Sequence, residues 1–210
     1  MSDKRVPARR RATQNRSKAT VQKILDAATG LIVEEDPRGV TMSEIAKRSG
    51  VVIGSLYQYF ADRSAICRAI LIRHHAEARA VLHHHVSTAR TFEEFVDALN
   101  QCFDVYFLML QTDRLIVGLW ALVQSDPELQ ALDLEDGQAN ARYLTAIAGP
   151  LLPGVDSDRL TASFVMLMQF SFYAGRLSRD MPASLAQHVP ESLKAACLHC
   201  LLALQRPQQA

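Results

Sequence analysis

The chain has 210 residues, a net charge of +1 and 21% charged residues, which is the composition of an ordinary folded protein. No apolar run is long enough to span a bilayer, and the polar, basic N-terminus does not read as a secretory signal. Four cysteines are too few for a disulfide framework in a chain of this size. We therefore expect a cytoplasmic protein with no membrane partner.

The charges are unevenly distributed along the chain. Residues 1–73 contain fourteen Lys and Arg against seven Asp and Glu, whereas residues 74–210 contain nine against fifteen. This asymmetry indicates that the front of the chain meets a polyanion. Residues 1–16 lack apolar periodicity, so we expect a flexible basic arm in which Arg9, Arg10 and Arg11 contact DNA. The alternative is an unstructured leader that only raises non-specific affinity.

The strongest local pattern follows a predicted helix over residues 17–35. Residues 41–60 read as two short helices joined by a tight turn. Thr41 and Glu44 have the spacing of a capping box, and Gly50 comes where the first short helix should end. This pattern predicts a helix-turn-helix, a motif whose second helix enters the major groove of DNA.

The remainder of the chain reads entirely as helices, and no stretch alternates with period two for long enough to indicate a sheet. A long helix is expected from Asp62 to roughly Thr88. Further helices are expected over residues 92–110, 113–123, 127–148 with a break near Gly137, 156–178 and 191–205. The sequence thus predicts an all-α fold of about nine helices. A helix-turn-helix domain over residues 17–62 would be followed by a larger helical ligand-binding and dimerisation domain over residues 63–206.

Residues from Val21 to about Ile66 resemble the DNA-binding domain of TetR-family transcriptional regulators. The matching positions are Ala27, Ala28, Thr41, Ile45, Ala46, Gly50, Val51, Gly54, Leu56, Tyr57, Tyr59, Phe60 and Arg63. Two positions depart from the family pattern. Val52 replaces the usual Ser or Thr cap of the recognition helix, and Ser64 replaces an acidic residue. Loss of such a cap costs on the order of 1 kcal/mol, so we expect this helix to be less well fixed before DNA binds.

The resemblance implies that residues 54–60 lie in the major groove of double-stranded operator DNA. Ser55 and Gln58 would read bases, since a glutamine amide can pair with an adenine edge. The residues expected to hold phosphates are Thr41, Lys47, Tyr57, Tyr59 and Arg63. Each of these side chains could instead simply solvate its helix.

The resemblance also implies a homodimer on a palindromic site, with the last two helices at the interface. On the final helix, the expected apolar stripe is Leu193, Cys197, Cys200, Leu201 and Leu204. On the helix before it, Ala162, Ala174 and Gly175 would allow close packing. The stripe could instead belong to the core of one chain.

The remaining helices would enclose a small-molecule effector whose binding releases the repressor from DNA. A large apolar and aromatic pocket is expected from Phe103, Tyr106, Phe107, Trp120, Tyr143, Met166, Phe170 and Tyr173. Arg142 and Gln169 are the expected polar anchors. Each apolar residue could equally be plain core.

Histidine and cysteine residues leave a metal- or redox-responsive regulator as the alternative. His74 and His75 lie roughly 12–16 Å along a helix from residues 83–85, too far for one simple site. Cys197 and Cys200 diverge on a helix, and a buried cysteine behaves as a small hydrophobe. No nucleophile elbow, phosphate loop or HExxH motif is present. We therefore expect no enzyme, no catalytic residues, no metal and no cofactor.

Overall fold

The computed structural model describes residues 8–205, with side chains from Arg16 onward. The regular structure in this range is entirely helical, which confirms the all-α prediction of about nine helices. The helices are α1 (Ala8–Glu34), α2 (Met42–Ser49), α3 (Ile53–Tyr59), α4 (Arg63–Val86), α5 (Phe92–Thr112), α6 (Arg114–Ser125), α7 (Pro127–Ala148), α8 (Ser157–Asp180), α9 (Ala183–Ala186) and α10 (Val189–Leu204), with a 3-10 helix η1 (Gly149–Leu151). Within this range no single helix is long and apolar enough to cross a membrane. In the same range, only the bent pair α5 and α6, taken together, reaches the necessary length and apolar composition.

The chain divides into two compact units that are not contiguous in sequence. The first unit runs up to Arg73 and also takes in residues 117–129, from α6 and the start of α7. The second unit comprises residues 74–116 and the chain from Gln130 onward. Part of α6 therefore folds with the helix-turn-helix, which lies far from it in sequence.

Helix α1 begins at Ala8, so the prediction that the first helix starts at Ser17 is wrong. Residues 8–16 contain Ala, Arg and Gln, which are strong helix formers, and no Gly or Pro. Such a segment continues a helix without any apolar face of its own. Residues 1–7 lie outside the described chain, as do the side chains of Arg9, Arg10 and Arg11, so their contact with DNA stays a prediction.

The helix-turn-helix has the predicted local chemistry. The Thr41 hydroxyl accepts a hydrogen bond from the Glu44 amide at 3.3 Å, and Glu44 Oε2 accepts one from the Thr41 amide at 2.8 Å. Gly50 ends α2 with a φ of 67°, a left-handed conformation that glycine adopts without a steric penalty. Val52 begins α3 with no side-chain hydrogen bond, as its apolar side chain predicts.

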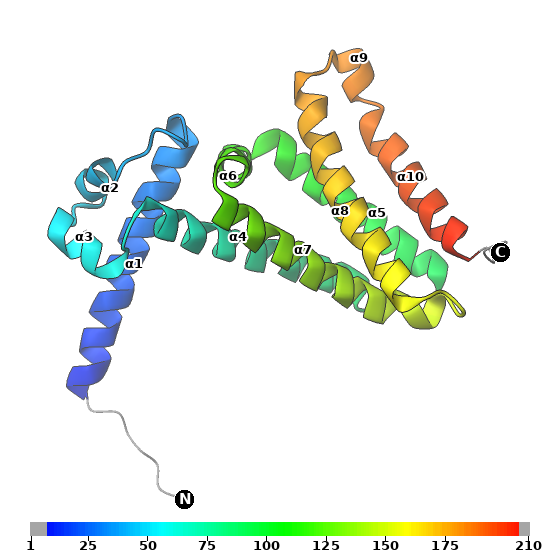
Figure 1. Cartoon of the computed structure of the whole chain (residues 1–210), viewed down its shortest axis with the longest axis horizontal. Helices are drawn as coiled ribbons and strands as arrows, with labels where there is room; N and C mark the ends of the chain where they lie inside the picture. The colour runs from blue at the N-terminus through cyan, green and yellow to red at the C-terminus, as the bar shows by residue number, and fades with distance from the viewer. Residues whose placement is uncertain (1–7, 206–210) are drawn as a thin grey trace, which may run out of the picture. The chain divides into compact units, whose positions relative to one another are not determined.

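A small apolar core holds α2 and α3 against α1 and the start of α4 in the first unit (Figure 1). Its most buried members are Ile24, Ala28, Ile45, Leu56 and Ile66, each at most 1% exposed. Beside this core, the Arg48 guanidinium bonds both carboxylate oxygens of Glu34 and ties α2 to α1. The recognition helix is therefore anchored through Leu56 to a scaffold built from three other helices.

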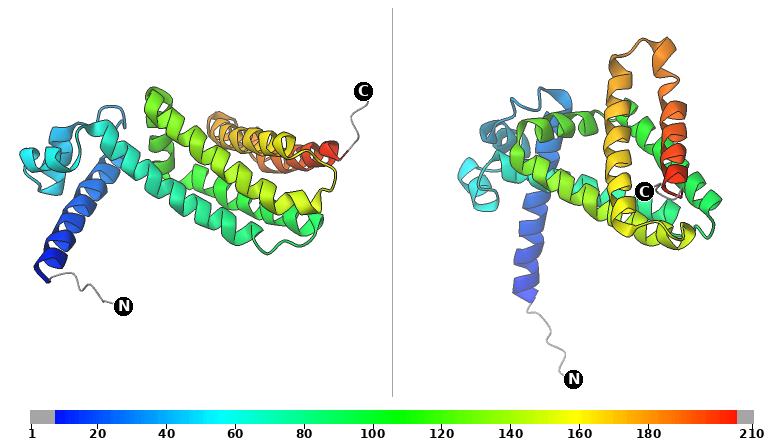
Figure 2. Two further views of the ribbon diagram at one scale, coloured as in Figure 1. Left: turned by 60° about the horizontal axis from the view of Figure 1, so that its bottom comes forward. Right: turned by 45° about the vertical axis from the view of Figure 1, so that its right-hand side comes forward.

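The core of the second unit lies among α5, α7, α8 and α10. Figure 2 shows α8 and α10 running side by side in both views. Phe95 of α5 meets Phe164 of α8 edge to face, with ring centroids 5.9 Å apart. Near the other end of α5, Gln111 Nε2 donates to the Gly175 carbonyl at 3.1 Å and to Ser178 Oγ at 2.7 Å. Aromatic packing and side-chain hydrogen bonds thus fix α8 against α5.

The start of α5 has only half of a capping box. The Thr91 hydroxyl accepts from the Glu94 amide at 3.2 Å. The Glu94 carboxylate, however, accepts from the amide of Arg90 at 2.7 Å and not from that of Thr91. The return hydrogen bond is therefore displaced by one residue.

Helix α7 runs unbroken through Gly137, so the predicted break there is wrong. Isolated glycine only weakens a helix, and the apolar contacts of α7 outweigh that cost. Gly118 of α6 differs, because a Cβ at this position would lie 2.6 Å from Ile32 Cγ2 and 3.1 Å from the Ile32 carbonyl oxygen. Close approach of α6 to the end of α1 therefore requires glycine at this point.

We predict that Gly118→Ala lowers the melting temperature of the protein, whereas Gly137→Ala raises it. Overpacking costs about 1–3 kcal/mol, which exceeds the ~1 kcal/mol that alanine gains over glycine in a helix. A Cβ at Gly137 meets nothing nearer than Gln169 Nε2 at 3.9 Å, so only the gain remains. Calorimetric melting of both variants checks this, with a shift of ~2–4 °C per kcal/mol for a chain of this size. Equal shifts would contradict the close packing of Gly118.

Candidate functional site

The exposed side of α3 carries the residues predicted to contact DNA. Tyr57 is 53% exposed and Tyr59 is 37% exposed. Gln58 is exposed and Ser55 is half-buried. Leu56, in contrast, is 0% exposed and fixes the opposite side of the helix. A short, firmly anchored helix with a polar and aromatic outer surface has the form of a recognition helix.

Two apolar residues at the start of α3 were missed as candidate contacts. Val52, the N-cap of α3, is 74% exposed, and Ile53, its first residue, is 40% exposed. Apolar side chains in the major groove contact the C5-methyl group of thymine. The missing polar cap at Val52 was visible in the sequence, and the structure shows that it leaves an exposed apolar side chain at the start of the helix.

Two of the residues predicted to bind phosphates, Thr41 and Arg63, already make structural contacts within the chain. The Thr41 hydroxyl donates to Glu44 Oε2 at 2.7 Å, and this hydrogen bond lowers the pKa of Glu44. Arg63 Nη1 donates to the carbonyls of Pro37 at 3.2 Å and Arg38 at 3.0 Å, which holds the loop before α2. Lys47 is exposed. Thr41 and Arg63 thus shape the helix-turn-helix, whatever they also do on DNA.

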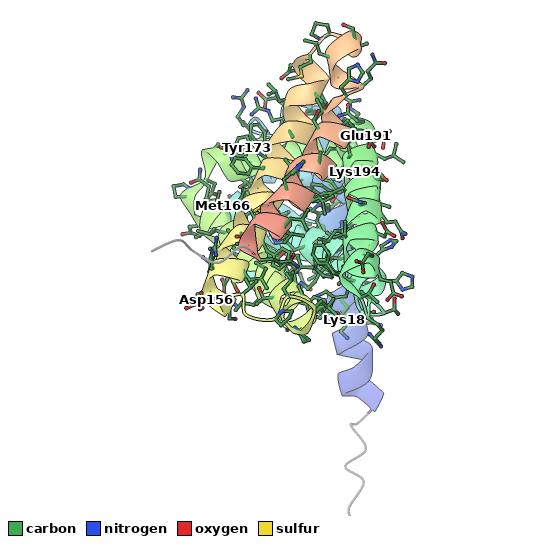
Figure 3. All side chains as sticks on the ribbon, turned by 90° about the vertical axis from the view of Figure 1, so that its right-hand side faces the viewer. Lys18, Asp156, Met166, Tyr173, Glu191 and Lys194 are labelled. Carbon is green, nitrogen blue, oxygen red and sulfur yellow. The ribbon has the colours of Figure 1, made fainter. Side chains whose placement is uncertain are left out.

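The residues predicted to line a pocket divide into an exposed group and a half-buried group. Met166, Phe170 and Tyr173 are 56%, 57% and 50% exposed. Figure 3 shows Met166 and Tyr173 along the same side of α8. Arg142 is also exposed, and Trp120 belongs to the first unit. The half-buried remainder consists of Phe103, Tyr106, Phe107, Tyr143 and Gln169. Burial raises the pKa of Tyr106 above its ordinary value, so its phenol stays neutral.

The predicted dimer stripe on α10 is core of the same chain, which was the alternative left open. Cys197, Leu201 and Leu204 are 3%, 1% and 7% exposed and pack in the core of the second unit. Leu193 and Cys200 pack against that core. Gly175 is also buried, because its neighbour across the helix pair is Leu110 of α5. Ala174 is half-buried and Ala162 is exposed. These buried residues are not available to a partner.

The second unit also contains a partly buried polar cluster between α4 and α7, which the sequence analysis did not find. We call it the polar seam: His75, Arg79 and His83 on α4, with Asp133, Asp136 and Asn140 on α7. His75 Nε2 lies 3.0 Å from Asp133 Oδ1. Both oxygens of Asp136 are bonded, one by Arg79 Nη2 and the other by Asn140 Nδ2 at 2.8 Å.

An aromatic contact continues the polar seam toward the apolar core. The His83 ring stacks on Tyr143, with ring centroids 3.6 Å apart and planes 20° from parallel. Burial and the nearby Arg79 cation lower the pKa of His83. Its imidazole is therefore neutral at pH 7. The repeat of His75, Arg79 and His83 at every fourth residue was the sequence signal for this face.

The cysteine and histidine residues do not form a reactive or metal-binding cluster in the described chain. Burial raises the pKa of Cys67 and Cys102 to about 11 and that of Cys197 to about 12. The thiolate is the reactive form of cysteine, so these thiols are protonated and inert at neutral pH.

We predict that Cys67 and Cys197 react with dithiobis(nitrobenzoate) at pH 7.5 only after unfolding. Both are almost fully buried, at 4% and 3% exposed, and both have raised pKa values. The thionitrobenzoate released in buffer and in guanidinium chloride counts the reactive thiols of the folded and the unfolded protein. Rapid reaction of both thiols in the folded protein would instead support a redox-responsive regulator.

Comparisons with known proteins agree with this geometry. The sequence profile of the family described as "Bacterial regulatory proteins, tetR family" matches residues 24–70. The chain is 24% identical over 171 residues to the HTH-type transcriptional regulator AlkX of Mycobacterium tuberculosis, covering 78% of this chain and 80% of that protein. It is 40% identical over 58 residues to the HTH-type transcriptional regulator Rv1255c of the same species, covering 28% of this chain and 29% of that protein.

Among solved structures, SmeT is similar in fold. SmeT is the repressor of the Stenotrophomonas maltophilia multidrug efflux pump SmeDEF, and its structure superposes with a TM-score of 0.65 at 21% identity, covering 87% of this chain and 88% of that one. A second SmeT structure, a complex with triclosan, gives a TM-score of 0.62 at 20% identity, covering 89% and 90%. These relatives are transcriptional regulators and not enzymes. With its helix-turn-helix and the family profile over residues 24–70, the first unit of the chain is similar to the DNA-binding domain of TetR-family transcriptional regulators.

Proposed function

We propose that this protein is a repressor that binds a palindromic operator as a homodimer and leaves it when a largely apolar small molecule binds the second unit. The observation that carries the proposal is α3, a recognition helix with Tyr57 and Val52 outward and Leu56 buried. Regulation by a small molecule is supported by SmeT, which is a repressor and has been solved with triclosan.

The chemistry of α3 suggests what kind of half-site it reads. Gln58 can pair with an adenine edge, while Val52 and Ile53 can contact thymine methyl groups. Tyr57 and Tyr59 offer hydroxyls to the phosphates that flank these bases. We propose a half-site containing A·T pairs, with the helical arginines before Ser17 adding backbone contacts.

An exposed apolar row on α8 supports the proposal that two copies of the chain form a dimer. We call it the α8 stripe: Ala162, Met166, Phe170, Tyr173 and Leu177. The four larger side chains are 50–57% exposed, an unusual concentration on one helix face of a monomer. The adjacent face of α10 carries Ala195, Ala196, Leu202 and Ala203, all exposed and small or apolar. We propose a four-helix interface from these two faces and their copies.

The experiment is a titration of the DNA upstream of the protein's own gene, followed by fluorescence anisotropy. We expect sequence-specific binding that weakens steeply with salt, because a dimer neutralising 6–10 phosphates loses ~10³–10⁵ in affinity between 50 and 200 mM salt. A scrambled duplex of the same composition is the control. Equal binding to both duplexes at all salt concentrations would reject the proposed operator.

A further inference from the structure

Three polar atoms of the polar seam are buried without hydrogen-bond partners in the described part of the chain: Arg79 Nε, His83 Nε2 and Asn140 Oδ1. Asn140 as a residue is only 6% exposed. Buried polar atoms in folded proteins are nearly always paired, and each exception costs free energy and calls for a physical reason. Three such atoms in one cluster make a site for another molecule a better explanation than a packing defect.

The three atoms are held in place by the paired members of the polar seam. Asp136 binds Arg79 through one carboxylate oxygen and Asn140 through the other, so both side chains are fixed from the same side. This arrangement leaves the Nε–H of Arg79 and the Oδ1 of Asn140 as the remaining donor and acceptor. His83 is held next to them by its stacking on Tyr143. Asp136 and Tyr143 thus hold the three side chains in place.

We propose that the polar seam binds the single hydroxyl head of a neutral, otherwise apolar effector. A hydroxyl can accept from Arg79 Nε–H and donate to Asn140 Oδ1 at once, which is the combination that these two atoms lack. His83 Nε2 adds a third contact as either donor or acceptor, depending on its tautomer. Tyr143, which stacks on His83, and Phe103 both pack against the apolar core and would offer apolar contacts to the body of the ligand. The inference rests on the proposed effector-binding role of the second unit.

Charge excludes the two commonest alternatives to a hydroxyl. A carboxylate cannot donate to Asn140 Oδ1, and it would add a negative charge beside Asp133 and Asp136, which only Arg79 offsets as a permanent cation. An ammonium group has no lone pair to accept from Arg79 Nε–H, so it would leave that donor unpaired. A purely apolar molecule would leave all three atoms unpaired. The polar seam therefore selects for a neutral head that both donates and accepts.

The test uses three matched probes that differ only in the head group: 4-hexylphenol, 4-hexylbenzoate and hexylbenzene. Calorimetric titration of the full-length protein without DNA should show saturable 4-hexylphenol binding. Binding of hexylbenzene and 4-hexylbenzoate should be weaker by about tenfold or more, since each lost hydrogen bond to a buried partner weakens binding about fivefold to tenfold. Equal affinity for hexylbenzene, or preference for the benzoate, would overturn the proposal.

Two variants tie the preference to the polar seam. Asn140→Leu keeps the side-chain shape but removes the open Oδ1 together with the Nδ2 that donates to Asp136. Arg79→Lys keeps the charge but removes Nε–H together with the Nη2 contact to Asp136. Each should lower 4-hexylphenol affinity about fivefold or more while hexylbenzene affinity is unchanged. Gln138→Leu, on the exposed side of α7, is the matched control and should bind as the parent protein does. If one variant fails to fold, the other carries the test alone.

Operator binding without probe is measured in parallel, so the two proposals fail separately. A protein that binds its operator but prefers no phenol, or a variant that retains the preference, overturns the polar seam proposal alone. In that case a buried water would satisfy the three atoms. Phenol binding through the polar seam without operator binding would instead contradict the proposed repressor function.

Discussion

Tyr57→Ala will abolish operator binding and leave the helical fold and the oligomeric state unchanged. Tyr57 is 53% exposed on α3, so its side chain contributes little to the core. On DNA, both its hydroxyl and its ring would contact the major groove. Loss of a contact worth ~1–3 kcal/mol from each half-site should cost about 2–6 kcal/mol per dimer, or ~30-fold in affinity at the least.

Two further substitutions on α3 make this result specific. Tyr57→Phe removes only the hydroxyl, so it should weaken binding to all duplexes through the lost phosphate contact and keep the sequence preference. Leu56→Ala, one residue earlier, removes a fully buried side chain and should lower stability by about 2–5 kcal/mol. Circular dichroism and anisotropy separate the two effects. Unchanged operator affinity in Tyr57→Ala would mean that α3 does not dock by this face.

The helix-turn-helix could be predicted from the sequence because the residues that begin and end its helices act locally. The capping box of Thr41 and Glu44 spans four residues, and the left-handed Gly50 needs no knowledge of the rest of the chain. Val52 was likewise readable as a missing cap. Its exposure was not, because exposure depends on which side of α3 the remaining helices cover.

The second unit shows where local reading fails. Helix α10 is apolar on more than one side, since Leu201 is buried while Leu202 is 39% exposed. Periodicity alone cannot tell which apolar side meets the same chain and which remains uncovered. The predicted dimer stripe therefore turned out to be core. The same ambiguity explains why Met166, Phe170 and Tyr173 of α8 were predicted to line a pocket, although they are exposed in the structure.

The polar seam was missed for a different reason. Its hydrogen bonds join α4 to α7 across about sixty residues of sequence, for example between His75 and Asp133 (58 residues apart). Adjacent histidines drew attention to metal binding, whereas in the structure His75 contacts Asp133 and His83 stacks on Tyr143 of α7. Pairing between distant helices is set by tertiary packing, which no local pattern encodes.

Phe170→Glu in the middle of the α8 stripe will convert the protein from a dimer into a monomer of 23.3 kDa. Phe170 is 57% exposed with Met166 and Tyr173 on either side, so the substitution costs the isolated chain almost nothing. In the proposed four-helix interface, however, the residue and its copy would approach each other. Two carboxylates buried there without partners would be strongly unfavourable. Sedimentation equilibrium of the variant measures the change directly.

Two matched substitutions separate loss of the interface from loss of the fold. Leu134→Glu changes a similarly exposed leucine on α7, 47% exposed, and should leave the dimer intact. Leu201→Ala changes the α10 face that is core, so it should lower the melting temperature through a cost of about 2–5 kcal/mol. Its remaining folded protein should still be dimeric. A dimeric Phe170→Glu variant would show that the α8 stripe is not the interface.

The monomeric variant also tests how the two proposed activities depend on each other. Its α3 is unaltered, so it should still bind a single half-site with the weak affinity of one head. The full palindrome should gain nothing over that half-site, because the second head is no longer held to the first. In the parent protein the palindrome should bind far more tightly than the half-site. Recognition of each half-site would then depend on α3, and the added affinity for the palindrome on the α8 stripe. Tyr57→Ala should therefore remove half-site recognition, whereas Phe170→Glu should remove only the gain from the second half-site.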